Sequence, residues 1–309
     1  MRAAPVLLPL SVAAVWIFWG STYAGMRLAG ETIPPLVMAS VRFLIAGGVL
    51  WIAADLTGRA RARREDWRAA FVGGAMLLMI GNATTAWALQ YLPTGITALL
   101  LSLTPVWMAL FDFMLYRGRL TWTAGLGMVL GLGGVAMLIA PSLLDRAAIG
   151  AMPVLWVALA ILSNVSWSLG SMLQRRLEGA RSLIRSTAMQ MLAGGVLIAG
   201  ESILFGQVGL VRWSEISPAS IGGLAWLIVF GSLVGYLAFL YVIRHAPTAL
   251  ASTYAYVNPL IAIILGMLLF GERLTAAEVV AGATILVGVA LMMLPNRGAA
   301  LAAEAPAPE

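Results

Sequence analysis

The chain has 309 residues, of which 61% are hydrophobic and only 10% are charged, and its mean hydropathy is +0.94. A soluble globular domain carries about 25% charged residues, so this composition excludes an ordinary soluble protein. The apolar residues lie in runs of roughly 20, the length of helix that crosses about 30 Å of hydrocarbon. The sequence therefore predicts an all-α integral membrane protein.

The charged residues and the lack of cysteine exclude several classes of partner and site. All 19 basic residues are arginines, against 13 acidic residues, and the formal charge is +6. The arginines lie between the apolar runs and form no basic face interleaved with aromatic residues, so no nucleic-acid partner is predicted. With no Cys and with His245 as the only histidine, disulfide frameworks and the common zinc sites are excluded, and no metal or cofactor is expected.

The apolar runs predict ten transmembrane helices, separated by charged or Pro/Gly-rich clusters. In chain order the predicted spans are 6–28, 33–53, 67–90, 93–116, 121–140, 152–174, 183–205, 218–243, 247–270 and 275–294. The first run is too long for the apolar region of a typical signal peptide and has no clear cleavage site, so we interpret it as the first helix.

Arginine is distributed unequally between the two sets of alternate connections. The set that includes both termini and the segment 55–66 holds fourteen arginines, and the other set holds four, Arg27, Arg146, Arg212 and Arg273. Because cytoplasmic loops retain positive charge during insertion, both termini are predicted to be cytoplasmic in a multi-pass protein of the bacterial inner membrane. Residues 297–309, which are rich in Ala and Pro and end in acids, are predicted to form a disordered cytoplasmic tail.

The sequence also contains an internal repeat. Three motifs recur at a constant offset of 154 residues, Leu92-Pro93-Thr94 as Ala246-Pro247-Thr248, Leu103-Thr104-Pro105 as Val257-Asn258-Pro259, and Gly118-Arg119-Leu120-Thr121 as Glu272-Arg273-Leu274-Thr275. The predicted halves are residues 1–145 and 146–296, with five helices each. Because five is odd, the two copies must lie in opposite senses across the bilayer, which is the inverted-repeat arrangement of secondary transporters.

These motifs resemble the drug/metabolite transporter superfamily and, within it, the EamA-type ten-helix exporters. The resemblance covers nearly the whole chain and rests on the paired motifs above, on Trp19-Gly20-Ser21-Thr22-Tyr23 ending in Arg27, and on Pro34-Pro35 leading to Arg42-Phe43. It implies two EamA-like inverted repeats in a basket-like shape that export amino acids, other polar metabolites or drugs. The chain looks most similar to the YddG-type exporters of aromatic and other amino acids. It departs from the family at Gly118, where Glu is common, which puts in doubt any role of that carboxylate.

Polar residues on two helices are the first candidates for a transport pathway, because a polar group facing lipid costs several kcal/mol. Asn164, Trp167, Ser168 and Ser171 fall on one face of the sixth predicted helix. In the third predicted helix, Asn82 and Thr85 share a face. Each of these residues taken alone could instead hold helices together.

Aromatic residues and one arginine complete the predicted substrate site. Trp19, Tyr236 and Tyr256 lie deeper than an interfacial aromatic belt and offer apolar walls with polar tips. Arg42 lies near the middle of the second predicted helix, so it should face protein or water. It could contact a substrate carboxylate or serve a structural role.

Glycine and proline patterns predict close packing and helix interruptions. Gly127, Gly131 and Gly134 form a GxxxG-type face, which we interpret as a backbone contact within or between protomers. Pro105 and Pro259 occupy matched positions and predict helix interruptions, which could be hinges or static kinks.

The leading functional hypothesis is an exporter of small neutral or zwitterionic metabolites, amino acids included, that works by alternating access without obligatory proton coupling. Its expected partners are the substrate and membrane lipids, and it is expected to be a monomer or weak homodimer. One alternative is a proton-coupled drug/metabolite efflux pump. A lipid-modifying enzyme would need clustered acids or histidines, and no catalytic residues are predicted. A scaffold would leave the repeat unexplained, and phosphorylated cargo would need several cavity cations.

Overall fold

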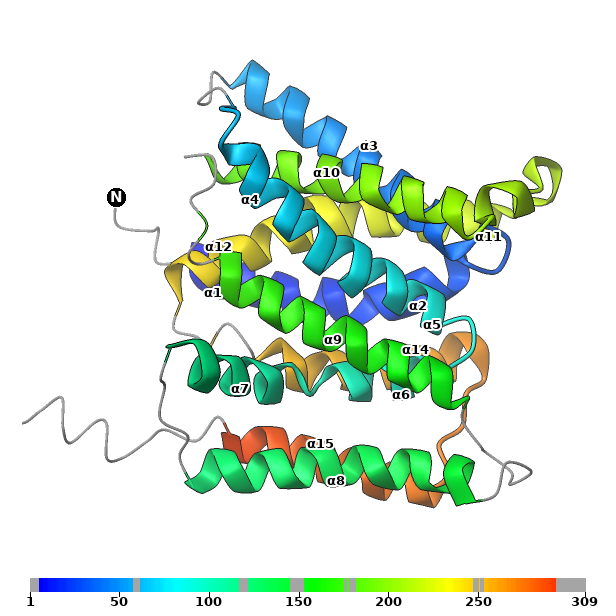
Figure 1. Ribbon diagram of the computed structural model, residues 1–309. Helices are drawn as coiled ribbons and strands as arrows, with labels where there is room; N and C mark the ends of the chain where they lie inside the picture. The colour runs from blue at the N-terminus through cyan, green and yellow to red at the C-terminus, as the bar shows by residue number, and fades with distance from the viewer. Residues whose placement is uncertain are drawn as a thin grey trace, which may run out of the picture.

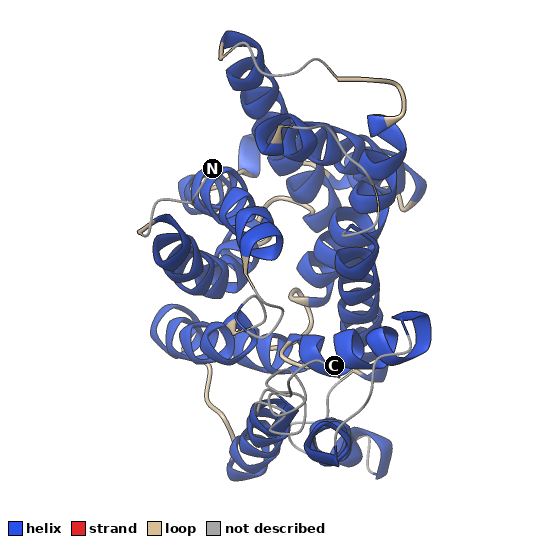
Figure 2. Cartoon of the chain, turned by 90° about the vertical axis from the view of Figure 1, so that its left-hand side faces the viewer, coloured by secondary structure: helices blue, strands red, loops and turns tan. Residues whose placement is uncertain are grey.

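The computed structural model describes residues 6–57, 62–116, 122–144, 153–174, 177, 182–246, 250 and 253–292. Within these ranges the regular structure is helical and contains no strand (Figure 2), which confirms the all-α class. Seven of the described helices are long and apolar enough to cross a membrane, and three shorter apolar helices accompany them, Trp122–Leu138, Val257–Phe270 and Ala276–Leu291. These stretches coincide within a few residues with the predicted spans, except that Val257–Phe270 covers only the later part of the predicted span 247–270, of which residues 247–249 and 251–252 lie outside the described structure.

The helical segments of the two halves follow one another in the predicted order. In the first half they are α1 (Leu7–Ala14), η1 (Val15–Trp19), α2 (Gly20–Ala29), α3 (Pro35–Leu56), α4 (Asp66–Gly73), η2 (Gly74–Ala83), α5 (Thr84–Ala88), α6 (Thr94–Leu101), α7 (Thr104–Tyr116) and α8 (Trp122–Leu144). In the second half they are α9 (Val154–Gln174), α10 (Leu183–Leu204), η3 (Gln207–Leu210), η4 (Trp213–Glu215), α11 (Pro218–Trp226), η5 (Leu227–Tyr236), α12 (Leu237–His245), α14 (Tyr254–Phe270) and α15 (Ala276–Met292).

Several helix boundaries follow from local sequence. Pro35 occupies the first turn of α3, where its missing N–H costs nothing. The hydroxyl of Ser217 accepts a hydrogen bond from the Ser220 backbone N–H at 3.1 Å and caps α11. Gly271 ends α14 in the left-handed conformation at φ 64°, which glycine adopts without steric cost.

The two halves contain matched π-helical segments, whereas the paired prolines occupy different places in their helices. η2 and η5 are ten-residue π-helical stretches at corresponding places in the third and eighth spans, and π-helices inside α-helices are frequent at functional sites. The fourth span is interrupted between Leu101 and Thr104, directly before Pro105, as predicted. The matching prediction is wrong in the second half, because Pro259 lies inside the continuous helix α14.

The leading span of each half packs mainly against the other half. In the first span, α2 contacts α11 and α14, and η1 contacts η5. In the sixth span, α9 contacts η2, α5 and α7. Each half therefore contributes one helix to the wall of the other, which brings residues from both halves to the centre of the bundle.

The remaining long contacts join the halves at opposite sides of the molecule. α3 lies along α10 at one side, and α8 lies along α15 at the other (Figure 1). Glycines permit the second contact, since a Cβ at Gly134 would lie 2.6 Å from the Cγ1 of Ile285, and one at Gly288 would lie 2.6 Å from the Gly127 carbonyl oxygen. The predicted glycine face thus forms a contact within one chain.

Candidate functional site

Residues of both halves line a cavity at the centre of the bundle, here called the central cavity. It contains about 650 Å³ of space between atoms, which includes space open to the outside. Its polar lining residues are Thr22, Arg42, Asn82, Thr85, Thr104, Ser163, Asn164 and Asn258. Its aromatic lining residues are Trp19, Tyr23, Phe43, Trp167, Tyr236 and Tyr254.

Two tryptophans, one from each half, meet at the wall of the central cavity. The ring centroids of Trp19 and Trp167 are 5.4 Å apart with an interplanar angle of 79°, an edge-to-face pair. Each ring lies on a glycine of the opposite half. A Cβ at Gly235 would be 2.7 Å from the Trp19 Nε1, and one at Gly81 would be 3.2 Å from the Trp167 Cε3. These glycines are 154 residues apart, so the aromatic wall repeats the internal symmetry of the sequence.

Asn164 binds the interrupted helix as well as lining the central cavity. Its Nδ2 donates to the carbonyl oxygens of Leu100 at 3.1 Å and Leu101 at 3.2 Å, and its Oδ1 accepts from the Thr104 hydroxyl at 2.7 Å. The carbonyls that a helix interruption leaves without partners need such donors inside a membrane. Asn164 therefore stabilises the gap between α6 and α7 and so fixes one wall of the cavity.

Arg42 is a buried cation at the central cavity. Its side chain reaches from α3, its Nε donates to the Ser232 hydroxyl at 2.8 Å, and its Nη1 donates to the Asn82 Oδ1 at 3.2 Å. The residue is only 3% exposed. The ion pairs of the described residues do not include it, so its described acceptors are both neutral. A Cβ at Gly231 would lie 2.8 Å from its Nη2, so glycine leaves room for the guanidinium.

The structure brings most of the predicted substrate-binding residues together. Seven of them line the central cavity, Trp19, Arg42, Asn82, Thr85, Asn164, Trp167 and Tyr236. Ser168 and Ser171 are buried but do not line it, although they share a helix with Asn164. Ser168 donates to the Thr104 carbonyl oxygen at 3.5 Å, so it contacts the neighbouring helix instead. The side chain of Tyr256 lies outside the described part of the structure.

Sequence reasoning missed three polar lining residues that carried a signal. Tyr254 accepts a hydrogen bond from the Trp167 Nε1 at 3.3 Å, and it lies two residues before the predicted Tyr256. Thr104 and Asn258 directly precede the paired prolines and are 154 residues apart. The repeat motif itself therefore identified them, since a polar residue that recurs beside a paired proline is unusual in a hydrocarbon environment.

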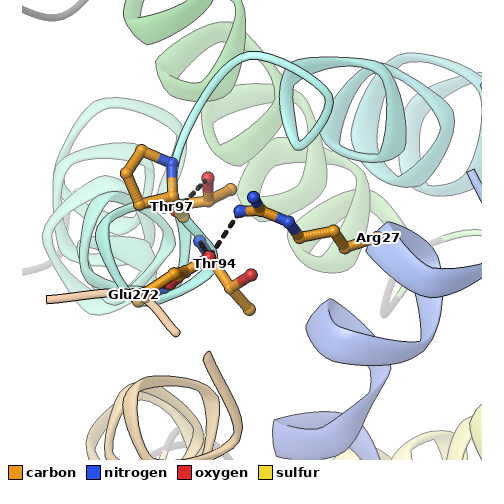
Figure 3. Close-up of polar contacts among 6 residues, drawn as sticks. Arg27, Thr94, Thr97 and Glu272 are labelled. Carbon is orange, nitrogen blue, oxygen red and sulfur yellow. Dashed lines mark hydrogen bonds and ion pairs between the residues drawn. The ribbon is translucent and has the colours of Figure 1, made fainter. Parts of the chain in front are cut away.

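A second polar cluster, the Arg27 cluster, joins the halves at one end of the bundle (Figure 3). Arg27 of α2 pairs with the Glu272 carboxylate, which follows α14 in the chain. The same carboxylate accepts from the Thr94 backbone N–H at 2.8 Å and from the Gly95 N–H at 3.4 Å. These amides open α6, where the positive end of the helix dipole favours an anion. Gly266 leaves room for this carboxylate, since a Cβ there would lie 2.4 Å from Oε2.

Arg27 also lines a further open cavity, here called the end cavity. The end cavity contains about 790 Å³ of space between atoms, including space open to the outside, and is lined by Arg27, Glu31, Leu89, Gln90, Leu269 and Phe270. Met26 lines the central cavity, and the next residue in α2, Arg27, lines the end cavity. Consecutive residues of α2 therefore line the two cavities, and the ion pair with Glu272 joins this part of α2 to the second half.

Comparisons with known proteins agree with this architecture. Residues 8–140 and 154–294 each match the EamA-like transporter family. The chain is 34% identical over 293 residues to the uncharacterized inner membrane transporter YedA of Escherichia coli (strain K12), and this match covers 93% of this chain and 92% of that protein. It is 26% identical over 266 residues to the uncharacterized transporter YvbV of Bacillus subtilis (strain 168), with 86% and 85% covered. A crystal structure of a protein with 21% sequence identity shares the fold at a TM-score of 0.65, over 98% of this chain and 100% of that one.

Proposed function

Since the chain belongs to the EamA-like transporter family, we propose that it exports small neutral or zwitterionic metabolites, aromatic and other amino acids among them, across the bacterial inner membrane. The observation that carries this proposal is the central cavity, which residues of both halves line together. A site shared by two repeats can be opened to either face when one half rocks against the other. The transport cycle proposed here is therefore alternating access.

The chemistry of the central cavity supports a small amphipathic cargo. The tryptophan pair and the neighbouring tyrosines offer an apolar surface for a side chain. Amide and hydroxyl groups of Asn82, Thr85 and Asn258 offer hydrogen-bond partners for polar groups. The relatives named above are uncharacterized transporters and do not indicate a substrate. The proposal of amino acids as cargo therefore rests on the similarity of the sequence motifs to YddG-type exporters.

The Arg27 cluster supports a closure at one end of the pathway. Glu272 of the second half contacts Arg27 and the first amides of α6, both in the first half. Opening at this end would separate the carboxylate from those partners. With both termini in the cytoplasm, as the arginine distribution predicts, this end would face the periplasm.

The ionisable groups at the central cavity support transport without obligatory proton coupling. Its described lining residues include Arg42 but no Asp, Glu or His, and proton relays in membranes ordinarily use chains of those three residue types. Arginine stays protonated at any working pH. The alternative, a proton-coupled efflux pump, predicts that a pH gradient alone accumulates substrate in proteoliposomes, and that an ionophore abolishes the accumulation.

The test is counterflow of labelled amino acids in proteoliposomes with wild type and two tryptophan variants. Trp167→Ala should weaken transport by about 1 to 3 kcal/mol of binding free energy, because it removes half of the aromatic wall. The matched control is Trp156→Ala, on the same helix, whose ring stacks on Tyr91 outside the cavity at a centroid distance of 3.8 Å. Equal transport by both variants and wild type would contradict the assignment of the central cavity.

A further inference from the structure

We propose that the central cavity requires a carboxylate on its cargo, with Arg42 as the ligand of that group, whereas it does not require an amino group. Small monocarboxylates with an aromatic or apolar body would then be cargo with or without the amine. This inference rests on the proposed function and names the chemical feature that its cargo must share.

The first support is that the charge of Arg42 has no described counterion. Its Nε and one N–H of its Nη1 donate to neutral oxygens, which leaves Nη2 and the other Nη1 N–H without an acceptor among the described residues. An arginine buried without an anion is costly unless other groups compensate it. A carboxylate that binds the fork of a guanidinium in two parallel hydrogen bonds supplies that compensation.

The second support is a comparison with the other deeply buried arginine of the described chain. Arg185 of α10 is 2% exposed, nearly as buried as Arg42. It pairs with the Asp55 carboxylate and does not line the central cavity. Both arginines lie over an aromatic ring, Arg185 over Trp51 at 4.4 Å and Arg42 over Phe43 at 4.8 Å. The chain itself thus supplies the anion of Arg185, which joins helices. Arg42 lines the cavity and has no anion among the described residues, so the anion is expected from the cargo.

The third support is that the described lining of the central cavity offers no anion for an ammonium group. Those residues include no Asp or Glu. An amine would meet neutral oxygens, of which the Asn258 Oδ1 is buried without a hydrogen-bond partner, and the faces of the tryptophans. These groups can contact an ammonium group but do not require one, so the cavity selects for the carboxylate end of an amino acid and not for its amino group.

The net charge of the cargo determines whether the membrane potential drives its transport. A zwitterion crosses the membrane without net charge, whereas a monocarboxylate anion carries one negative charge. A membrane potential that is negative inside the cell favours the exit of that anion. For such cargo, uniport through the central cavity would therefore be driven outward by the potential.

The test compares four ligands that differ only in their charged ends, in proteoliposomes with the wild-type protein. Labelled phenylalanine and labelled 3-phenylpropanoate are taken up separately, and each is competed with unlabelled phenethylamine and 3-phenylpropanamide. Both labelled acids should be transported, and the amine and amide should compete roughly 10- to 100-fold more weakly, the loss expected for a hydrogen bond to a charged group. An inside-positive potential set by a potassium gradient and valinomycin should accumulate phenylpropanoate.

Each outcome has a distinct meaning. Transport of phenylalanine without phenylpropanoate, or strong competition by phenethylamine, would overturn the carboxylate proposal and leave the proposed function standing. Transport of phenylpropanoate without phenylalanine would overturn amino-acid export and support the carboxylate proposal. Uptake of neither acid would overturn both.

Two arginine variants provide the residue-level arm of the test. Arg42→Gln should lose the preference for phenylpropanoate over 3-phenylpropanamide, because a neutral side chain no longer distinguishes the acid from the amide. Arg185→Gln, which also replaces a buried arginine, should keep that preference even if its yield is lower. Retention of the preference in Arg42→Gln would overturn the assignment of Arg42.

Discussion

The contacts of Glu272 allow the closure at the Arg27 cluster to be perturbed by a single change from carboxylate to amide. Glu272→Gln keeps the shape of the side chain and removes its charge. A hydrogen bond to a charged group contributes about 1.5 to 3 kcal/mol and a neutral one about 0.5 to 1.5 kcal/mol, so the bond from Thr94 should weaken by about 1 kcal/mol. The ion pair adds at most about 1 kcal/mol more, because the Arg27 side chain is 33% exposed and solvent screens it.

The closed state should therefore lose about 1 to 2 kcal/mol relative to the open state, which corresponds to roughly a 5- to 30-fold shift in their ratio. The shift can be measured by electron paramagnetic resonance distances between spin labels at Glu31→Cys and Leu269→Cys, which line the end cavity from opposite halves. The native chain has no cysteine, so these two substitutions provide the only labelling sites. The variant should increase the population with the longer distance.

Two controls separate a closure from a general effect of charge. Glu278→Gln changes a carboxylate that accepts from the Thr275 backbone N–H at 2.7 Å within the first turn of α15, so it should leave the distance unchanged. The exchanged pair of Arg27→Glu with Glu272→Arg should not restore closure, because an arginine cannot accept from the amides of α6. An unchanged distance in Glu272→Gln, or full rescue by the exchange, would refute the reasoning.

Three further predictions concern the fold, the cavity wall and the topology. Gly134→Val should lower the melting temperature, because the added Cβ would meet α15 at 2.6 Å, whereas Gly133→Val next to it has nothing within 4 Å and should not; equal melting temperatures would contradict the packing. Asn164→Ala should reduce both transport and thermal stability, by about 1 to 3 kcal/mol of unfolding free energy, since it leaves carbonyls of the interrupted helix unpaired; transport lost at full stability would show a role in substrate binding alone. Single cysteines at the exposed residues Glu65 and Glu215 should react with impermeant reagents from the cytoplasmic and periplasmic sides respectively, and the reverse pattern would refute the predicted orientation.

A residue of the candidate site could be predicted from the sequence where it lies near the middle of a predicted span and faces the centre of the bundle. Trp19, Trp167 and Arg42 meet both conditions, and helical periodicity with depth was enough to identify them. Periodicity failed for Ser168 and Ser171, because a shared helical face is wide enough to contact both a cavity and a neighbouring helix. Which part of the face meets the cavity depends on where the helices of the other half lie.

The sequence by itself determined the class, most of the helical spans and the internal repeat. The length of an apolar run decides whether a helix can cross the bilayer, and the repeat is visible in the constant spacing of the motifs. Only the tertiary structure decided which residues of the two halves meet. Arg27 and Glu272 are 245 residues apart, and no local pattern relates one to the other or to the first amides of α6. Pro105 interrupts its helix beside Asn164, whose side chain satisfies the exposed carbonyls, whereas Pro259 lies inside a continuous helix. The local sequence around a proline thus did not determine its place in the helix, because the partners of the Leu100 and Leu101 carbonyls come from another helix.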